Sequence, residues 1–507
     1  MFSKVKSVGI FGINTYLIEI EADVSGGLPC FDIVGLPDIA VKESRDRVRS
    51  AIKNCGFKFP TGRITVNLAP ADKKKEGAVY DLPVLLSILG ASGQLGASYD
   101  NSVFLGEVSL DGRVRPVNGI LAMVITALKC GITNVFVPAE NATEAAAVKG
   151  VTVYPVTSVK ALIDHLSGAF SIVPASFTQK LSDNSDTLDF SDVKGQVAAK
   201  KALEVAAAGG HNVIMIGPPG SGKSMLAKRL PSILPDMTFE ESIETTKIHS
   251  VAGLLDKDNP IITKRPFRSP HHTVSLAGLT GGGTVPKPGE ISLAHNGVLF
   301  LDELPEFKRD AMEAMRQPLE DGKITVSRVS GSVVYPSEIM LVAAMNPCPC
   351  GNYGSPVKPC VCTKNAVSKY LNKVSGPMLD RIDLHVEVPA VDYKSLSDNT
   401  PAESSAEIKE RVNRARKLQT ERYKGTKITC NARLTPKMLK DFCVMSDEAQ
   451  KCLNQSFDSL GLSARSYDRI LKVARTLADL AGNEKIEKEN IFSAIRFRTL
   501  DRKYWIE

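Results

Sequence analysis

The sequence predicts an α/β protein of three domains, because of its length, its alternating strand-like and helical segments, and two breaks in its apolar pattern. A chain of 507 residues is too long for one hydrophobic core, since domains of ~150 residues are typical. Polar stretches at Thr178–Asp189 and Ser395–Ser405 have the composition of linkers. We therefore expect domains over residues 1–177, 187–395 and 404–507.

Composition sets broad limits on function. Hydrophobic residues make up 43% and charged residues 23%, which is typical of a folded globular protein rather than a disordered or fibrous one. The longest apolar run, Leu82–Leu89, is less than half of the ~20 residues that span a bilayer, and Met1–Ile10 lacks the pattern of a secretory signal. We expect a cytoplasmic protein. A net charge of +7 is too small to indicate a nucleic-acid ligand by itself.

The segment before Thr178 is predicted to be a mixed α/β domain. Short runs rich in β-branched residues alternate with longer stretches of helical periodicity. The predicted strands are Thr15–Ile20, Ile64–Leu68 and Val135–Val137, and the predicted helices are Val41–Asn54 and Leu121–Lys129.

The middle segment contains a phosphate-binding pattern. A predicted helix over Gly195–Ala208 is followed by an apolar strand, Val213–Ile216, which leads into a loop of the form G-x-x-x-x-G-K-[ST]. Backbone N–H groups of such a loop can surround a phosphate, and its lysine and serine serve the phosphates and Mg²⁺. The predicted ATP-binding residues are Gly217, Pro218, Pro219, Gly220, Ser221, Gly222, Lys223 and Ser224.

Two further strands end in polar residues that suit ATP hydrolysis. Gly297–Leu301 leads into Asp302, a candidate Mg²⁺ ligand, and Glu303, a candidate general base. A buried strand capped by acids is common, but its combination with the phosphate-binding loop is specific. Ile339–Ala344 leads to Asn346, a candidate for orienting water. The alternative for Asn346 is a turn residue before Pro347.

The C-terminal segment is predicted to be helical. Apolar residues recur there at a spacing of three and four. They include Ile470, Val473, Ala474, Leu477 and Leu480.

The motifs together resemble the AAA+ set of the Mg-chelatase-like clade, and the whole chain is identified as a member of its ComM/YifB family. The resemblance adds Ala344-Met-Asn346-Pro and Gly376-Pro-Met-Leu-Asp-Arg381-Ile-Asp to the two ATP motifs. It implies that Asn346 is the sensor-1 residue, Arg381 the arginine finger, and Arg465 the sensor-2 arginine of a helical lid. Arg469 is a rival for the last role.

An arginine finger implies assembly. It acts on the ATP of a neighbouring subunit, so the resemblance implies a ring, expected to be a hexamer. The alternative for Arg381 is a surface ion pair with Asp380 or Asp383.

The N-terminal segment resembles the proteolytic domain of Lon, a Ser–Lys enzyme. Matching stretches are Lys75-Glu-Gly-Ala-Val79, Leu110–Leu121 and Val137–Asn141. The resemblance implies an α+β fold of the ribosomal S5 domain 2-like type. Val79 falls at the nucleophile position and Leu121 at the lysine position, and neither side chain can react. We therefore expect no proteolysis. The same inactivated fold in the ComM/YifB family is associated with DNA work.

Two insertions are candidates for holding DNA. One contains Lys264–His272 and Gly278–Gly289, and the other, Ile324–Tyr335, alternates as a hairpin around Ser330-Gly331. In related ring helicases such insertions line the pore, which basic residues suit because they bind phosphates. The candidates are Lys264, Arg265, Arg268, Lys323 and Arg328.

The adjacent histidines His271 and His272 have two interpretations. They could bind a metal, but adjacent side chains point apart in an extended chain, which favours a structural role in hydrogen bonding.

Four cysteines lie within fifteen residues, as Cys348-Pro-Cys350 and Cys360-Val-Cys362. Glycine, proline and polar residues separate the pairs, as in a short loop around a tetrahedral metal, so Zn²⁺ is the predicted ligand. The C-x-C spacing is tighter than the usual C-x₂₋₄-C, and buried unligated cysteines or an iron–sulfur cluster are the alternatives.

The ATP motifs and the family resemblance together imply an ATP- and Mg²⁺-dependent DNA motor, a hexameric helicase that moves branched recombination intermediates, as in natural transformation. The alternative is a metal-chelatase-like motor that remodels a protein partner. The Lon-like N-terminal segment favours the DNA motor. A Lon-like protease is disfavoured by Val79 and Leu121.

Overall fold

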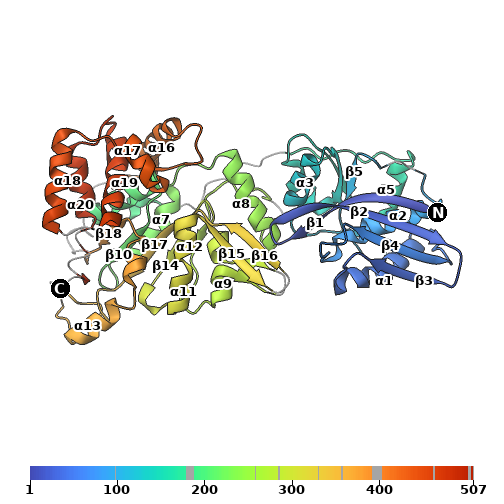
Figure 1. The fold of residues 1–507 in the computed structure, drawn as a ribbon, viewed down its shortest axis with the longest axis horizontal. Coiled ribbons are helices and arrows are strands. Elements are labelled where there is room, and N and C mark those ends of the chain that lie inside the picture. The colour runs from blue at the N-terminus through green and yellow to red at the C-terminus, as the bar shows by residue number, and fades with distance from the viewer. Residues whose placement is uncertain are drawn as a thin grey trace.

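A computed structural model gives the fold of the chain (Figure 1). It describes residues 1–96, 99–177, 188–256, 259–283, 286–328, 331–355, 358–390, 402–460, 463–498, 500 and 504–505. Most of both expected linkers, residues 178–187 and 395–401, lies outside the described residues. Figure 1 shows an elongated molecule, with an N-terminal lobe (residues 1–177) at one end and the central region (188–390) and C-terminal helical region (402–498) at the other.

The N-terminal lobe is built on a seven-stranded mixed sheet, ordered β3-β4-β2-β1-β5-β8-β9. Its elements are β1 (Phe2–Phe11), β2 (Asn14–Ser25), β3 (Cys30–Val34), α1 (Ile39–Asn54), β4 (Arg63–Ala69), η1 (Ala78–Tyr80), α2 (Asp81–Ala91), β5 (Ser102–Phe104), β6 (Glu107–Val108), β7 (Val114–Arg115), α3 (Ile120–Lys129), β8 (Asn134–Pro138), η2 (Ala139–Asn141), α4 (Ala142–Ala146), β9 (Thr152–Val156) and α5 (Val159–Leu166).

The predicted strands and helices of this lobe are present, with shifted ends. Strand β2 is longer than expected because it pairs with β1 along the whole hairpin, from Phe2↔Asp23 to Phe11↔Asn14. Helix α1 begins at Ile39, because the Asp38 carboxylate caps it by accepting a hydrogen bond from Val41 N. The apolar run of α2 is a core helix, buried along nearly its whole length.

The central region contains a five-stranded parallel sheet, ordered β11-β14-β17-β10-β18. Its elements are η3 (Phe190–Asp192), α6 (Val197–Gly209), β10 (Val213–Ile216), α7 (Lys223–Arg229), η4 (Leu230–Ser232), α8 (Phe239–Ala252), β11 (Phe267–Arg268), α9 (Leu276–Thr280), β12 (Gly281–Gly282), β13 (Lys287–Pro288), α10 (Glu290–Leu293), β14 (Val298–Leu301), η5 (Leu304–Glu306), α11 (Arg309–Ala314), α12 (Arg316–Asp321), β15 (Lys323–Arg328), β16 (Gly331–Pro336), β17 (Met340–Met345), α13 (Lys364–Leu371), α14 (Gly376–Leu379) and β18 (Leu384–Glu387).

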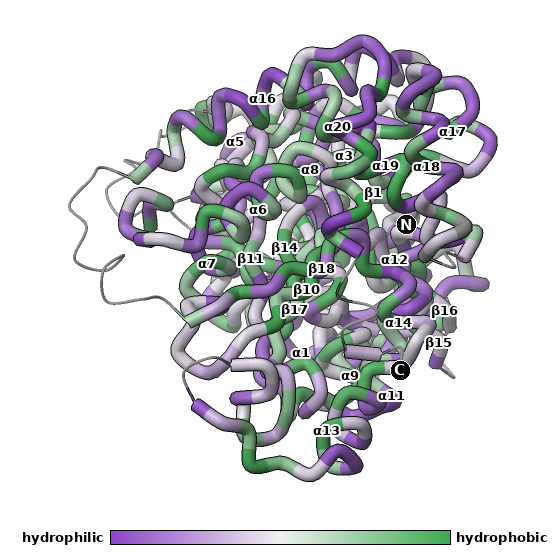
Figure 2. The backbone as a smooth tube through the Cα atoms, turned by 90° about the vertical axis from the view of Figure 1, so that its left-hand side faces the viewer, coloured by the Kyte–Doolittle hydropathy of each residue, from purple (hydrophilic) through white to green (hydrophobic). Residues whose placement is uncertain are grey.

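The inner strands of this sheet are buried on both faces. Every residue of β10, β14 and β17 is buried, which explains why these strands are continuous apolar runs rather than alternating ones. Figure 2 shows the hydrophobic strands β10, β14, β17 and β18 enclosed by helices with many hydrophilic turns. Because the strands are parallel, their carboxyl ends lie at one edge.

Contacts between the N-terminal lobe and the central region involve the hairpin β15–β16 and the helix α8. The hairpin β15–β16 reaches the lobe, where a Cβ on Gly12 would lie only 2.6 Å from the Val333 side chain. Next to it, the carboxylate of Glu144 accepts hydrogen bonds from the Ser250 hydroxyl at the end of α8 and from Leu121 N. Burial raises the pKa of Glu144, whereas these hydrogen bonds lower it.

The hairpin that the sequence predicts around Ser330-Gly331 is present as β15 and β16, with Ser330 outside the described residues.

The C-terminal region is helical, as predicted. It comprises α16 (Ser405–Arg422), η6 (Asn431–Arg433), α17 (Pro436–Phe442), α18 (Asp447–Leu460), α19 (Ala464–Ala481) and α20 (Lys488–Arg496). Polar contacts fix it to α6, because Arg416 and Gln419 donate to the carbonyls of Ala207 and Ala208. Among the described residues, no helix combines the length and the apolar character that crossing a bilayer would require.

A buried carboxylate joins the central and C-terminal regions. Asp383, just before β18, pairs with Arg469 of α19 and lies 3.3 Å from His211 Nδ1. Burial alone would raise the pKa of Asp383, but Arg469 and His211 hold it well below its usual range. The ion pair therefore stabilises the folded state only while both partners are present.

We expect Arg469→Ala to destabilise the protein by about 3–5 kcal/mol, because it leaves the charge of Asp383 buried without its main partner. Thermal unfolding at neutral pH measures the loss. A depressed carboxyl pKa contributes stability above the unfolded value of about 4, and this stability is lost as the pH falls. The difference between wild type and variant should therefore shrink in acid.

Arg465→Ala is the matched control. Its ion pair with Asp380 joins 65% and 37% exposed side chains at 3.6 Å, so its loss should cost less than about 1 kcal/mol. Equal losses in the two variants would contradict a structural role for the Asp383 pair.

Candidate functional site

The G-x-x-x-x-G-K-[ST] loop lies between β10 and α7, in the order that the sequence predicts. Its first glycine is tightly packed, since a Cβ on Gly217 would lie 2.0 Å from the carbonyl oxygen of Val388. Gly220 and Gly222 have φ angles of +74° and +90°, which favour glycine. The loop therefore needs its glycines for conformation as well as for access to a phosphate.

The lysine of this loop is held by neutral oxygen atoms. Lys223 Nζ donates to the carbonyls of Gly217 and Pro218 at 2.7 and 2.9 Å, and lies 3.3 Å from Asn346 Oδ1. Its hydrogen-bond partners among the described residues are carbonyl, hydroxyl and amide oxygens, and none of these partners is a carboxylate. Burial lowers the pKa of Lys223 to about 8, against the attraction of Asp302. A desolvated ammonium in this position suits an anionic ligand.

The serine of the loop contacts the first acid of the second motif. Ser224 Oγ donates to Asp302 Oδ2 at 2.6 Å, and Asp302 Oδ1 accepts from Glu303 N at 3.0 Å. A hydroxyl and a carboxylate are oxygen ligands of the kind that Mg²⁺ prefers. The pair therefore fits a Mg²⁺ ion beside bound phosphates.

Asn346 follows β17, which lies between β10 and β14. Its side chain thus reaches the space between the loop and the acidic pair, where it contacts Lys223. The structure brings together four of the predicted site residues at the carboxyl edge of the sheet: Lys223, Ser224, Asp302 and Asn346.

Glu303 has a histidine neighbour that the sequence reading missed. His272 Nδ1 lies 3.5 Å from Glu303 Oε2. The rings of His271 and His272 have centroids 4.1 Å apart, so the expectation that the two side chains point apart is wrong. The segment is a turn rather than an extended chain. The signal that could have found the contact is the position of this segment directly after a strand.

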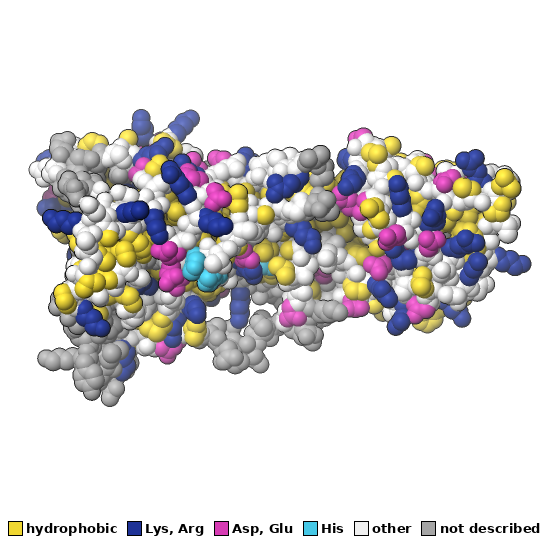
Figure 3. All heavy atoms as spheres, turned by 90° about the horizontal axis from the view of Figure 1, so that it is seen from below, with side chains coloured by type: hydrophobic (Ala, Val, Ile, Leu, Met, Phe, Trp, Pro, Cys, Tyr) yellow, Lys and Arg dark blue, Asp and Glu magenta, His cyan; other side chains and the backbone are white. Residues whose placement is uncertain are grey.

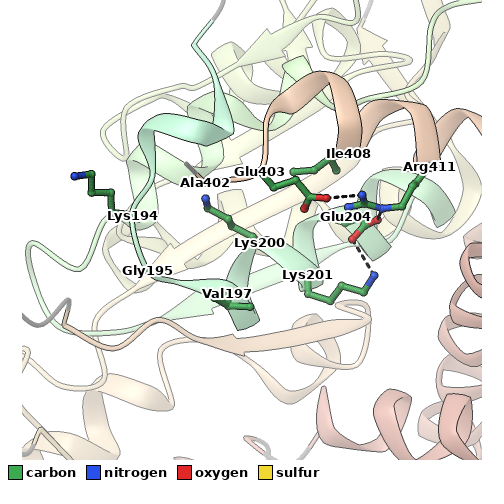
Figure 4. Close-up of a pocket in the computed structure, with 10 residues that line it drawn as sticks. All are labelled: Lys194, Gly195, Val197, Lys200, Lys201, Glu204, Ala402, Glu403, Ile408 and Arg411. Atoms are coloured by element: carbon green, nitrogen blue, oxygen red, sulfur yellow. Dashed lines mark hydrogen bonds and ion pairs between the residues drawn. The ribbon is translucent and has the colours of Figure 1, made fainter. Parts of the chain in front are cut away.

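A cavity of about 430 Å³ is lined by residues of α6, of α16 and of the segments just before these helices (Figure 4). Gln196, between two residues that line the cavity, donates to Ser221 O and Pro389 O. On the far wall, Glu204 accepts from Lys201 and Arg411 at 2.9 and 2.6 Å. The cavity therefore has charged walls and borders the segment that holds the loop. Its lining residues are Lys194, Gly195, Val197, Lys200, Lys201, Glu204, Ala402, Glu403, Ile408 and Arg411.

The candidate arginine finger, Arg381, does not form the surface ion pair with Asp380 or Asp383 that was its alternative interpretation. Its guanidinium pairs with Glu320 and donates to Pro377 O at 2.5 Å, and the residue is only 8% exposed. None of its described contacts is with the phosphate-binding loop of the same chain.

The two rival sensor-2 arginines have different environments. Arg469 is engaged with buried Asp383, whereas Arg465 keeps an exposed side chain and a long contact with Asp380. Arg469 therefore serves the packing of the helical region, whereas the Arg465 side chain stays 65% exposed.

The four clustered cysteines converge. Their sulfurs lie within 4.8 Å of one another, and they are the only group of three or more metal-ligating side chains found among the described residues. Cys348 Sγ lies 3.4 Å from Cys350 Sγ and 3.7 Å from Cys360 Sγ. Backbone N–H groups, Asn352 first, lower the pKa of Cys350 to about 6. The loop also touches the ATP loop, because a Cβ on Gly351 would lie 2.3 Å from Pro219 Cδ.

The positions that would carry Ser–Lys chemistry are part of the hydrophobic core. Val79 and Leu121 are both buried. Neither position offers a nucleophile or a base.

The basic candidates for DNA contact divide into two groups. Arg265 donates to Pro235 O, Asn296 O and Glu241, and Arg268 makes a two-bond pair with Glu290, so both are engaged within the fold. Lys264, Lys323 and Arg328 remain exposed. Figure 3 shows basic side chains interspersed with acidic ones on one face, rather than gathered in a single patch.

Comparison with known proteins supports one family over the whole chain. Family profiles described as "Magnesium chelatase, subunit ChlI", "Subunit ChlI of Mg-chelatase" and "Magnesium chelatase, subunit ChlI C-terminal" match residues 189–396, 20–141 and 402–498. The chain is 44% identical over 510 residues to competence protein ComM of Haemophilus influenzae, covering 98% of this chain and 97% of that protein.

A second relative agrees with this placement. Uncharacterized protein YifB of Salmonella typhimurium is 43% identical over 494 residues, covering 97% of this chain and 96% of that protein. A shorter match, 32% identical over 163 residues and 29% of this chain, is to Lon protease 2 of Bacillus subtilis. The chain has the phosphate-binding loop, the acidic pair Asp302-Glu303 and this similarity along its length. It therefore belongs to the ComM/YifB family of Mg-chelatase-like AAA+ ATPases.

Proposed function

We propose that this protein is an ATP-driven DNA motor, a hexameric helicase that moves branched recombination intermediates. The observation that carries the proposal is the group of ATP-site residues at one edge of the parallel sheet, in a chain similar along its length to a protein named for competence. An inactive Lon-like domain (1–177), an ATPase domain (187–395) and a helical lid (404–507) make up the proposed architecture.

The residues have distinct proposed roles. Lys223 and the backbone of the loop bind the phosphates, while Ser224 and Asp302 hold Mg²⁺, which neutralises phosphate charge when bound. Glu303 accepts the proton of the attacking water, and Asn346 orients that water. Arg465 supplies the sensor-2 charge from the lid, because Arg469 is occupied by Asp383.

Arg381 is proposed to act on the ATP of a neighbouring subunit. In this structure its guanidinium is paired with Glu320, so action in trans requires that pair to open. Its described contacts are with Glu320 and Pro377 rather than with the phosphate-binding loop of its own chain, which supports a role across an interface.

The cysteine loop is proposed to bind Zn²⁺ as a closed structural site. Four converging thiolates match tetrahedral coordination and leave no position for a reactive water. Because the loop packs on Pro219, the metal supports the ATP loop rather than the chemistry.

Exposed Lys264, Lys323 and Arg328 are the residues proposed to contact DNA. Basic side chains can bind phosphates without reading sequence, which suits a motor. Arg265 and Arg268 are left out of this set because the fold already uses them.

The first prediction concerns DNA-dependent turnover. We expect single-stranded and forked DNA to stimulate ATP hydrolysis, Glu303→Gln to abolish it, and the double variant Lys323→Ala/Arg328→Ala to lose stimulation while keeping the basal rate. Steady-state ATPase assays measure all three. A rate indifferent to every DNA form would instead favour a motor that remodels a protein partner.

The second prediction tests action in trans. Glu303→Gln and Arg381→Ala should each be inactive, but mixing them should restore part of the rate, since some interfaces then join an intact Glu303 to an intact Arg381. Mixing Glu303→Gln with Lys223→Ala is the control. Both residues are proposed to act in the ATP site of the same subunit, so no site in this mixture is intact and the rate should not recover. No recovery in the Arg381→Ala mixture would argue against the finger.

The third prediction concerns the metal. The purified protein should contain about one zinc per chain, and Cys350→Ser/Cys360→Ser should remove it, because two thiolates cannot hold the ion. Elemental analysis after gel filtration measures the content. Cys130→Ser, at an exposed cysteine outside the cluster, is the matched control. Zinc-free wild-type protein would refute the site.

A further inference from the structure

The proposed ATPase mechanism leaves His272 unused, although it lies beside Glu303. His272 Nδ1 is 3.5 Å from Glu303 Oε2, a separation that a small rotation of either side chain converts to a hydrogen bond. Within the described part of the chain, His272 is the only ion-pair partner of the Glu303 carboxylate. The contact therefore bears directly on where this carboxylate points.

The sheet explains why these two residues meet. Strand β11 pairs in parallel with β14, with Phe267 opposite Val298 and Arg268 opposite Leu299. The residues after each strand therefore leave the sheet at the same edge, His272 after β11 and Glu303 after β14. The contact is fixed by strand register rather than by proximity in sequence.

Both side chains start from constrained positions. Glu303 has a φ angle of +53°, a left-handed conformation that a non-glycine residue adopts only when its surroundings require it. The His272 ring packs edge-on to Phe307, a buried residue, with centroids 6.4 Å apart. At the base of its segment, the two-bond pair of Arg268 with Glu290 anchors β11.

The metal interpretation of the histidines finds no support in this geometry. His271 and His272 belong to no group of three or more ligating side chains in the described residues. His271 turns its Nδ1 to Thr273 within the same loop, at 2.9 Å from Oγ1. Only His272 faces the ATP site.

We propose that His272 is a positioning residue for Glu303. Its Nδ1–H donates to the carboxylate and fixes the orientation in which the other oxygen faces the attacking water, as an orienting group does for a general base. His272 touches no nucleotide in this role. The inference rests on the proposed role of Glu303 as the base, and it assigns the Lys264–His272 insertion a part in hydrolysis.

The test compares His272→Ala with His271→Ala in the full-length protein, using Mg²⁺-ATP as substrate. We expect His272→Ala to lower kcat about tenfold, the loss of one hydrogen bond to a charged group, with KM changed less than about twofold. His271→Ala, in the same loop but turned away from Glu303, should keep both constants within about twofold. Thermal unfolding confirms that both variants fold.

A conservative variant separates positioning from packing. His272→Asn places an amide N–H close to the position of Nδ1, so this variant should recover most of kcat. If His272 were needed only for its bulk, the smaller asparagine side chain would not restore kcat. Unchanged or raised kcat in His272→Ala, or equal losses in His271→Ala, would overturn the proposal.

Glu303→Gln, assayed alongside, distinguishes the two levels of failure. If Glu303→Gln retains turnover, the proposed role of the base is wrong and the positioning role is wrong with it. If Glu303→Gln is inactive while His272→Ala has wild-type kcat, only the positioning role is wrong. In the double variant His272→Ala/Glu303→Gln, the loss of His272 should have no further effect.

Discussion

The hydrogen bond between Ser224 and Asp302 is the contact on which the candidate ATP site depends. The two residues are far apart in sequence and meet because β10, β17 and β14 lie side by side in parallel. The register that sets Val213 opposite Val342, and Leu299 opposite Leu341, brings the ends of all three strands to one edge. A shift of any one of these strands along its neighbours would therefore move the phosphate-binding loop, the acidic pair Asp302-Glu303 and Asn346 away from one another.

The same edge connects the site to the rest of the molecule. Gly217 packs against the carbonyl of Val388 after β18, and Pro219 lies against the cysteine loop that follows β17. The segment before β18 carries Arg381 and also Asp383, which Arg469 ties to the helical region. The proposed finger and the ion pair that holds the helical region therefore lie two residues apart in one chain segment.

In the N-terminal lobe, the two positions that the resemblance to Lon aligns with a reactive serine and lysine contribute to packing instead. Val79 and Leu121 fill the core, and the backbone N–H of Leu121 instead donates to Glu144, the carboxylate that Ser250 of the central region also contacts. The lobe also packs on β16 at Gly12. The lobe therefore contacts the hairpin that carries Arg328, one of the residues proposed to contact DNA.

The sequence by itself determined the parts that depend on local pattern. The phosphate-binding loop, the apolar strands before it and before Asp302, the β15–β16 hairpin and the helical C-terminal region follow from spacing and turn chemistry. Only the tertiary structure decided which distant groups meet. It paired Arg381 with Glu320, Arg469 with Asp383, and His272 with Glu303, because strand register and helix packing, which no local pattern encodes, set those contacts.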